Sequence, residues 1–253
     1  MKTIRFITNT VIVVIFSIGM LTAQNNQHYR IHVDYVYPSS SDAYEKVSKR
    51  LADLAKENKE EKGWNVLWTN DNRVVSISPI GGWEEMGDEF MPNTRAKLGD
   101  EKFGEIFEEF DNHYDQHNDY IITLSNNLSY MPDGMTTTPE GQNYRKNLVM
   151  YHKARDRQKI AEIAQKYKDL YTEKGSKSHY RLYFSGFGNP ESYILVSYAS
   201  ESPLDHANKA EANRELIGEE GEKMWKELSK YITKIEYTEG NMVPELSYNP
   251  SKS

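Results

Sequence analysis

The amino-acid sequence predicts an α+β fold in which one βαββαβ unit occurs twice in tandem. Residues 128–132 read Leu-Ser-Tyr-Met-Pro, and residues 246–250 read Leu-Ser-Tyr-Asn-Pro, 118 positions later. At the same offset an apolar helical face that contains Ile106 matches one that contains Met224. Because an internal repeat determines the whole architecture, these matches define the two halves before any single element is assigned.

Closer to the start of the chain the offset between matching residues is 116. The helical stripe Tyr44, Val47, Leu51, Leu54 and Ala55 corresponds to Ile160, Ile163, Tyr167, Leu170 and Tyr171. The strand residues Trp64, Val66 and Trp68 correspond to Tyr180, Leu182 and Phe184. Five matched elements in the same order indicate a duplication.

The first unit begins with residues 29–37, which alternate between apolar and polar side chains as a half-buried strand does. Residues 39–42 read Ser-Ser-Ser-Asp and can cap the helix that follows, which ends before Gly63. The turn at 70–72, Asn-Asp-Asn, indicates a hairpin. The remaining predicted elements are strands at 64–69 and 73–78, a helix that contains Ile106, Phe107 and Phe110, and a strand at 120–124.

The second unit follows a segment rich in proline and glycine at 131–143, which is typical of a linker. Its predicted elements are a strand at 147–153, a helix at 156–174, strands at 179–185 and 192–199, a helix at 211–230 and a strand at 232–237. The predicted organisation is a signal peptide at 1–23, a first repeat at 24–130, the linker at 131–143 and a second repeat at 144–253.

This order of elements is the split βαβ, or ferredoxin-like, motif, in which an antiparallel sheet carries helices on one face. We expect Ile31, Val33 and Tyr35 to pack against the helices of their own half. The other face of each sheet then needs a cover, and the second half can supply it.

With these two units the chain resembles the dimeric α+β barrel superfamily, which includes the NIPSNAP-like and antibiotic-biosynthesis-monooxygenase-like proteins. The resemblance rests on element order and duplication over nearly all of residues 28–243. It implies that the two antiparallel sheets pair as an intramolecular barrel. Members of the superfamily include monooxygenases, haem-handling enzymes and proteins with no known activity, so the fold alone does not define a reaction. This chain contains no motif of the superfamily from which catalytic residues could be assigned, and the cofactor is unknown.

The first residues have the pattern of a bacterial-type signal peptide. Lys2 and Arg5 form a positive start, residues 11–21 are apolar, and Ala23 precedes a polar stretch. The apolar run is too short for a bilayer core, which takes about 20 helical residues. We expect a protein exported to the periplasm or the cell exterior, without stable membrane insertion after signal cleavage. An uncleaved anchor is the alternative.

The composition excludes several kinds of site. The chain has no cysteine, which excludes disulfides, thiolate catalysis and cysteine-ligated zinc. Its net charge is −7 and it lacks a basic patch, so we expect no nucleic-acid partner. The 18 tyrosines and 4 tryptophans suit strands and cavity walls. The partner that fits these features is a small-molecule ligand.

One face of the first strand presents Arg30, His32 and Asp34, because side chains alternate along a strand. If the apolar face meets the helices, these groups point between the two sheets. Counted by the same parity, the predicted ligand-binding set is Arg30, His32, Asp34, Asn65, His152, Arg181 and Tyr183. The alternatives are a partly exposed strand, or a solvated interior across which Arg30 and Asp34 merely pair.

The two halves differ on this face. Leu148 and Met150 occupy the positions of His32 and Asp34, so one half of the interior is predicted to be polar and the other apolar. Such a cavity suits an amphipathic organic ligand, and drift in a structural core explains the pattern equally. The candidate catalytic residues are His32 and His152, since a histidine near a carboxylate can act as an acid or base.

His113 and His117 have the i, i+4 spacing that places two rings on one helical face. Two imidazoles so placed can bind zinc or copper if further ligands converge. However, residues 111–119 are polar almost throughout, and the second half lacks both histidines. The sequence therefore favours a solvated helix end over a metal site.

Three functions remain open from the sequence. The first is a protein that binds a small organic ligand between its sheets. The second is a monooxygenase-like or haem-handling enzyme that uses His32 or His152. The third is a structural or interaction protein whose interior is filled. A ligand-sized polar cavity favours the first two functions, and a packed interior favours the third.

Overall fold

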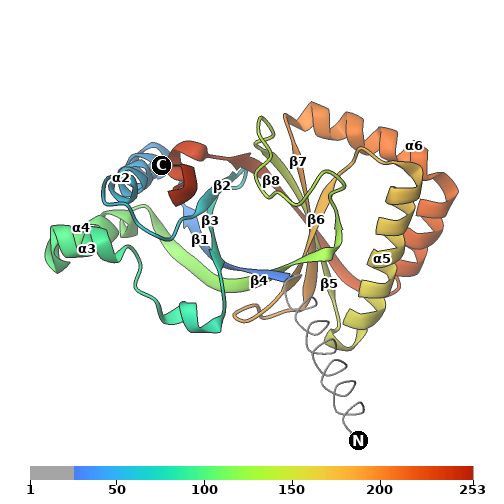
Figure 1. The fold of residues 1–253 in the computed structure, drawn as a ribbon, viewed down its shortest axis with the longest axis horizontal. Coiled ribbons are helices and arrows are strands. Elements are labelled where there is room, and N and C mark those ends of the chain that lie inside the picture. The colour runs from blue at the N-terminus through green and yellow to red at the C-terminus, as the bar shows by residue number, and fades with distance from the viewer. Residues whose placement is uncertain (1–25, 253) are drawn as a thin grey trace, which may run out of the picture.

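The structure is a computed structural model, and it describes residues 26–252. The predicted signal peptide at 1–23 lies outside these residues. Eight antiparallel strands form one closed barrel, and helices cover its outside on two opposite sides (Figure 1). Within residues 26–252 no helix combines the length and the apolar character that a membrane crossing requires. The predicted fold, two βαββαβ units that form an α+β barrel, is confirmed.

The first half contains four strands and three α-helices. They are β1 (Asn26–Val36), α2 (Ser41–Glu57), β2 (Asn65–Thr69), β3 (Arg73–Ile80), α3 (Pro92–Leu98), α4 (Asp100–Asp111) and β4 (Tyr114–Tyr130). The second half contains four strands and two α-helices. They are β5 (Tyr144–His152), α5 (Arg157–Lys174), β6 (Tyr180–Ser185), β7 (Tyr193–Ser200), α6 (Pro203–Leu228) and β8 (Ile232–Met242).

The barrel has the strand order β1-β3-β2-β8-β5-β7-β6-β4. Each half therefore supplies four adjacent strands, and the halves are joined where β2 pairs with β8 and β4 pairs with β6. Leu67 lies opposite Met242 at the first seam, and Thr123 lies opposite Phe184 at the second. Closure leaves neither sheet with an unpaired edge, which removes a common site of aggregation.

Apolar side chains form one cluster on the outer face of each half. In the first half the cluster lies between the sheet and the helices α2 and α4, with Val47, Ala55 and Ile106 almost fully buried. In the second half Ile160 and Ile163 of α5 are fully buried against the sheet. A smaller cluster, which includes Ile31, Val33, Ile122 and Tyr183, belongs to the inside of the barrel.

The repeated Leu-Ser-Tyr motif connects each half to the other. Tyr130, at the end of β4, donates a hydrogen bond of 3.0 Å to the backbone oxygen of Ser176, just after α5. Tyr248, after β8, donates one of 2.7 Å to the backbone oxygen of Glu60, just after α2. Both tyrosines are buried, so the two copies of the motif make the same contact in opposite directions.

The strand β4 is longer than the predicted strand at 120–124. Its first part, from Tyr114 to Asp119, is mostly exposed and polar, and it pairs with β1 through backbone hydrogen bonds that require no apolar alternation. After Ser125 its register against β6 shifts, and pairing resumes at Tyr130. Residues 131–143 form no helix or strand and connect β4 to β5.

Candidate functional site

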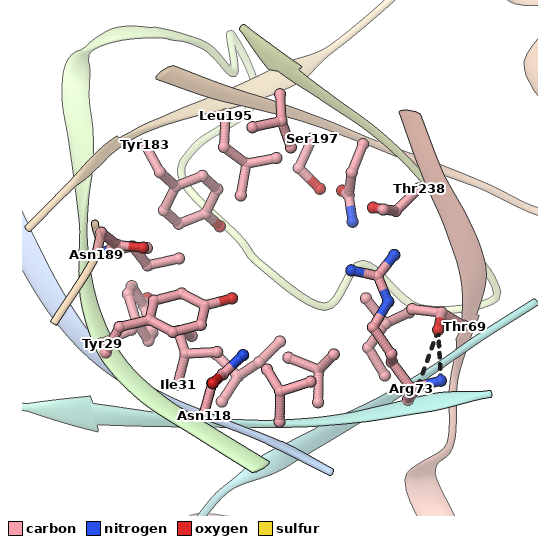
Figure 2. A pocket seen from close by; sticks show the side chains of 18 of the residues that line it. Tyr29, Ile31, Thr69, Arg73, Asn118, Tyr183, Asn189, Leu195, Ser197 and Thr238 are labelled. Carbon is pink, nitrogen blue, oxygen red and sulfur yellow. Dashed lines mark hydrogen bonds between the residues drawn. The ribbon is translucent and has the colours of Figure 1, made fainter. Parts of the chain in front are cut away.

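A cavity of about 540 Å³ lies inside the barrel, between the sheets of the two halves. Its wall consists of alternate residues of the strands, because successive side chains point to opposite faces of a sheet. Figure 2 shows Tyr29 and Ile31 of β1 opposite Leu195 and Ser197 of β7, with Tyr183 of β6 beside them. The interior is therefore not packed solid. A packed interior would have favoured a purely structural role.

Three of the predicted ligand-binding residues line this cavity. Asn65 of β2 and both Arg181 and Tyr183 of β6 point into the barrel. Their binding role stays a prediction. The alternation of side chains along the strand does assign the correct inward face to β2 and β6.

The prediction that Arg30, His32 and Asp34 face the space between the sheets is wrong. Ile31 and its alternate neighbours on β1 line the cavity, whereas Arg30, His32 and Asp34 lie on the outer face toward the helices. Both faces of a barrel strand are covered, so apolar side chains are not restricted to the face that meets the helices. On the outer face one oxygen of the buried Asp34 carboxylate accepts a hydrogen bond from Tyr44 of α2, and the other lies 3.0 Å from Nε2 of His32.

The prediction that His152 lies near the end of the interior is also wrong, because His152 lies on the outer side. The cavity is lined by Val149 and Tyr151 of β5, so His152, one residue further on, belongs to the opposite face. Its side chain is buried, and Nδ1 lies 2.9 Å from the backbone oxygen of Lys153. The outer face of β5 carries Met150, which packs in the second-half core.

Two arginines are buried in the wall of the barrel cavity. Arg145 of β5 is 4% exposed and Arg181 of β6 is 2% exposed. Arg145 donates hydrogen bonds to the backbone oxygens of Gln142 (2.5 Å) and Thr137 (2.8 Å). The Nε of Arg181 donates to the backbone oxygen of Thr136. The segment that connects β4 to β5 thus holds both guanidinium groups through neutral carbonyl oxygens.

Neither guanidinium group pairs with a carboxylate of residues 26–252, and the Nη1 of Arg181 is buried without a hydrogen-bond partner. Burial and the charge of Arg181 lower the pKa of Arg145 to about 10. Burial also lowers the pKa of Arg181. Both groups remain cations at neutral pH, so the cavity wall carries two positive charges that form no ion pair.

Tyrosines supply hydroxyl groups next to these arginines. The rings of Tyr29 and Tyr183 meet edge to face, with centroids 6.1 Å apart. Burial raises the pKa of each phenol, and the cation of Arg181 opposes that rise without cancelling it. Both hydroxyls therefore stay protonated at neutral pH, and each can donate a hydrogen bond.

Another part of the wall carries a compensated arginine. The guanidinium of Arg73 points into the cavity in Figure 2, and its Nη2 lies 2.6 Å from a carboxylate oxygen of Asp71. The hydroxyl of Thr69 binds the backbone of Arg73. Glu236 also lines this cavity; it pairs with Lys234 at 2.6 Å and accepts a hydrogen bond of 2.7 Å from Tyr151. Charge in this part of the wall is thus balanced, unlike charge at Arg145 and Arg181.

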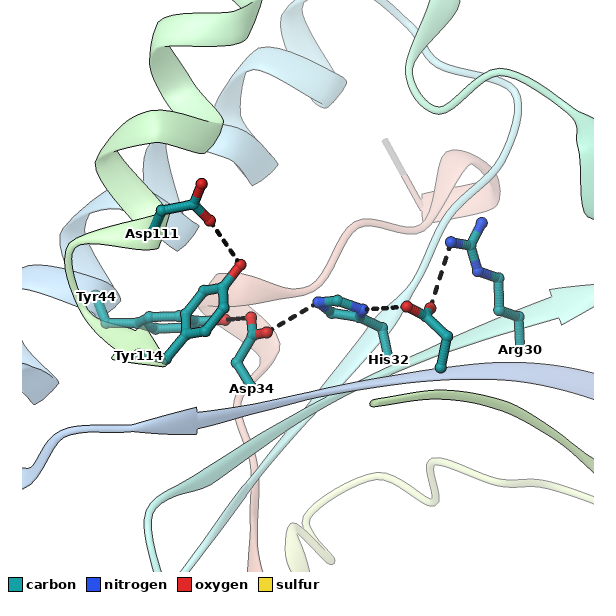
Figure 3. A network of polar contacts seen from close by, with 7 residues as sticks. Arg30, His32, Asp34, Tyr44, Asp111 and Tyr114 are labelled. Carbon is teal, nitrogen blue, oxygen red and sulfur yellow. Dashed lines mark hydrogen bonds and ion pairs between the residues drawn. The ribbon is translucent and has the colours of Figure 1, made fainter. Parts of the chain in front are cut away.

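A separate polar network lies on the outer face of β1 (Figure 3). The Nε2 of His32 lies 3.0 Å from Asp34, and its Nδ1 lies 3.2 Å from Asp119. Tyr44 donates a hydrogen bond of 2.5 Å to the other oxygen of Asp34. Arg30 pairs with Asp119 at 3.3 Å.

The two carboxylates determine the charge of His32. Burial of the ring lowers its pKa, but the hydrogen bonds and charges of Asp34 and Asp119 raise it by more, so that the pKa of His32 lies above its usual value of 6.5. His117 adds a neighbouring ring, with centroids 5.6 Å apart. His32 is accordingly a histidine held between two acids, which favours its protonated form.

Each half also has an outer cavity between its sheet and its helices. In the first half a cavity of about 670 Å³ is lined by His32 and Asp34 together with aromatic residues, among them Trp64 and Phe107. In the second half a cavity of about 490 Å³ is lined by apolar and aromatic residues such as Met150 and Trp225. Only the first of these two cavities has a histidine in its wall.

The predicted pairing of His113 and His117 on one helical face is wrong. The helix α4 ends at Asp111 and β4 begins at Tyr114, so His113 lies in the turn and His117 lies in a strand. The i, i+4 spacing then no longer brings the rings together. Across the part of the chain that the structure describes, no group of three or more histidine or acidic side chains could hold a metal ion.

Arg145 and Tyr29 line the cavity but are not among the residues predicted from the sequence. A signal for them was present in the second half, where Leu148 and Met150 form the apolar face and Arg145 and Asn147 the polar one. With an offset of 116 positions, Tyr29 corresponds to Arg145, so the face assignment of the second half also places Tyr29 inside the barrel.

Comparisons with known proteins support the fold. No protein-family model and no curated protein matches the chain. An anthrone oxidase-like protein has a similar structure, with a TM-score of 0.55, 8% identity, and coverage of 87% of this chain and 93% of that one. A proposed monooxygenase from Lactobacillus acidophilus NCFM matches with a TM-score of 0.53 and 7% identity, over 90% of this chain and 97% of that one.

Chlorite dismutase from Candidatus Nitrospira defluvii, in complex with imidazole, matches with a TM-score of 0.50 and 9% identity, over 90% of this chain and 96% of that one. At these identities the likeness concerns the fold alone. The chain therefore has the dimeric α+β barrel fold that its sequence resembles.

Proposed function

We propose that this protein binds a small organic molecule inside its barrel, and that it does so outside the cytoplasm. The observation that carries the proposal is the cavity of about 540 Å³ enclosed between the two sheets. Ligand sites commonly have volumes of about 300–1,000 Å³ and combine apolar walls with a few convergent polar groups. This cavity has both, since Ile31, Val149 and Leu195 line it together with Arg181 and Tyr183.

The names of the structural neighbours agree with chemistry on small molecules but do not identify a ligand. An oxidase-like protein, a proposed monooxygenase and a chlorite dismutase share the fold at 7–9% identity. Because one fold serves many functions, the cavity and not these names supports the proposal.

A neutral aromatic alcohol, 2-naphthalenemethanol, is a suitable first probe, because its two fused rings can pack against the tyrosine-rich wall. We expect isothermal titration calorimetry to detect its binding to the protein. Val149→Trp adds a large ring inside the barrel and should abolish binding. Leu204→Trp adds the same ring at a position on α6 that is 70% exposed, and it should leave binding unchanged. Equal binding to both variants, or failure of both this alcohol and its carboxylate analogue 2-naphthoate to bind, would contradict the proposal.

The natural ligand can be sought directly. The protein is purified without denaturation and analysed by native mass spectrometry, followed by an untargeted search for small molecules that it releases. We expect a released compound in the sample of the wild-type protein and none in that of Val149→Trp.

Export is the second part of the proposal, and it rests on the pattern of residues 1–23. Fractionation of cells that express the full chain should recover the protein outside the cytoplasm. N-terminal sequencing of that protein should begin near Gln24. Recovery of an intact N-terminus in the cytoplasmic fraction would contradict export.

The outer cavity of the first half supports a second candidate function, an acid–base enzyme of the monooxygenase-like kind. The observation in its favour is His32, which lies between two carboxylates in the wall of a cavity with aromatic side chains. Addition of flavin should then produce a bound absorbance spectrum that is lost in His32→Ala. If the spectrum of the variant equals that of the wild type, His32 has no role in cofactor binding.

The haem-handling form of this candidate has less support. Histidine, cysteine, methionine and tyrosine are the side chains that ligate haem iron. Both ring nitrogens of His32 already lie within 3.2 Å of carboxylate oxygens. The barrel cavity and the second-half outer cavity have no histidine or cysteine among their lining residues. They do contain methionines and tyrosines, but burial raises the pKa of tyrosines such as Tyr183 and Tyr198, which disfavours the phenolate that would bind iron. We therefore derive no step through haem.

A further inference from the structure

We propose that the ligand of the barrel is a small organic anion whose carboxylate lies against the guanidinium groups of Arg145 and Arg181. This inference rests on the proposed function and adds the chemical class of the ligand. It starts from two buried cations that line one cavity and form no ion pair with a carboxylate of residues 26–252.

These two arginines are exceptional in this protein. Most other arginines of the described chain pair with a carboxylate, and these pairs are Arg30–Asp119, Arg50–Glu109, Arg73–Asp71, Arg95–Asp100, Arg155–Asp156 and Arg214–Glu211. Arg157 lies over the ring of Phe184. The side chains of the paired arginines are 28–77% exposed, whereas Arg145 and Arg181 are almost completely buried. The two most buried arginines, Arg145 and Arg181, are thus without a carboxylate partner.

A buried ion without a partner is destabilising by several kcal/mol, so such a pair needs a source of compensation. Each of the two guanidinium groups offers five N–H donors. Backbone carbonyls accept four hydrogen bonds from them, and the buried Nη1 of Arg181 has no acceptor. A carboxylate supplies both the missing charge and the missing acceptors, in a geometry that matches the planar guanidinium fork.

The rest of the wall defines the body of the ligand. Tyr29 and Tyr183 present aromatic rings beside the arginines, and Ile31 and Leu195 add apolar surface. Asp119, Glu191 and Glu236 line the same cavity, and their negative charges disfavour a second acidic group on the ligand. The ligand class is therefore a monocarboxylate with an apolar or aromatic body.

The test compares 2-naphthoate with 2-naphthalenemethanol, which has the same rings and no charge. Calorimetric titration of the wild-type protein should give at least about tenfold tighter binding of the carboxylate, which corresponds to ~1.4 kcal/mol. Arg181→Met should bind both compounds about equally. The matched variant Arg157→Met removes a cation that does not line the cavity, and it should retain the preference.

Thermal unfolding distinguishes a ligand-binding arginine from one that stabilises the fold, because loss of a stabilising arginine lowers the Tm. Because Arg181→Met removes a buried uncompensated charge, the Tm of the ligand-free variant should equal or exceed that of the wild type. If Arg181→Met does not fold, Arg145→Met replaces it in the titration.

The outcomes separate the two proposals. Binding of neither compound overturns the barrel as a ligand site, and this inference with it. Equal binding of both compounds to the wild type is compatible with a ligand site in the barrel, but it overturns the proposal that the ligand is an anion. A preference for the carboxylate that persists in Arg181→Met also overturns the assignment, as does inorganic phosphate if it displaces 2-naphthoate at equal concentration.

Discussion

The hydroxyl oxygen of Ser129, in the first half, accepts a hydrogen bond of 2.9 Å from the backbone nitrogen of Leu182, in the second half. The same hydroxyl donates to the backbone oxygen of Ser125, four residues earlier. The equivalent residue of the second copy, Ser247, accepts from Val66 N at 2.9 Å and donates to Val243 O. Each serine fills a gap in the backbone pairing across one seam of the barrel.

Loss of these hydroxyls should therefore weaken the protein at both seams. Ser129→Ala leaves the amide of Leu182 buried without an acceptor, and we expect a loss of about 1–3 kcal/mol in the free energy of unfolding. Ser247→Ala should lose less, because its contact with Val66 is only partly buried. Urea denaturation measures both changes. Ser229→Ala, at an exposed position, is the control and should change stability by less than about 0.5 kcal/mol. If both seam variants are as stable as the wild type, the hydrogen bonds of Ser129 and Ser247 do not stabilise the seams.

Tyr44 should stabilise the protein more than an ordinary buried tyrosine hydroxyl, because it donates to the carboxylate of Asp34. Hydrogen bonds to charged groups contribute about 1.5–3 kcal/mol, and neutral ones contribute about 1 kcal/mol. Tyr44→Phe should therefore lower the free energy of unfolding by more than Tyr248→Phe, which removes a bond to the backbone oxygen of Glu60. Equal losses in chemical denaturation would show that the charge of Asp34 adds nothing.

The stability that His32 contributes should depend on pH. Its pKa is raised in the folded state, so its contribution is fully present below about pH 6.5 and is lost as the pH rises through the folded-state pKa. We expect the difference in unfolding free energy between wild type and His32→Gln to be larger at about pH 5 than at about pH 8. The difference between the two proteins is the quantity to use, because burial lowers the pKa of His179 and His206. A difference that does not change with pH would contradict the ion pairs with Asp34 and Asp119.

Two glycines should respond in opposite directions to replacement by alanine. Gly240 lies at the seam between β2 and β8, where a Cβ would stand 2.1 Å from the backbone oxygen of Trp68. Gly240→Ala should cost about 1–3 kcal/mol, because backbone atoms must shift. Gly104 lies within α4 and has open space around it, so Gly104→Ala should add about 0.5–1 kcal/mol. Thermal unfolding of the two variants checks the sign of each change, and a stabilised Gly240→Ala would contradict the close approach.

Much of the fold could be predicted because it depends on local patterns. The apolar stripe from Tyr44 to Ala55 defines α2, and its match at Ile160 and Ile163 defines α5. The boundaries of β4 could not be found in the same way. Residues 114–119 are polar and exposed, and they form a strand only because β1 offers them a backbone partner.

The candidate site could be predicted only in part. Asn65, Arg181 and Tyr183 were assigned to the interior, and all three line the cavity. Arg30, His32, Asp34 and His152 were assigned there and lie on the outer side. Alternation identifies the two faces of a strand, but it does not say which of them is inside a barrel.

The sequence by itself determined the order of the elements, the two matching halves and the residue types that share each strand face, since all of these follow from periodicity and spacing along the chain. Only the tertiary structure decided which face became the interior. It also brought Arg145 and Arg181 together, although they are 36 positions apart in the chain. The physical reason is that both faces of a barrel strand are buried, so the burial of apolar area favours either orientation. The choice depends on which polar groups find partners, and Asp34 finds Tyr44 on the outer side.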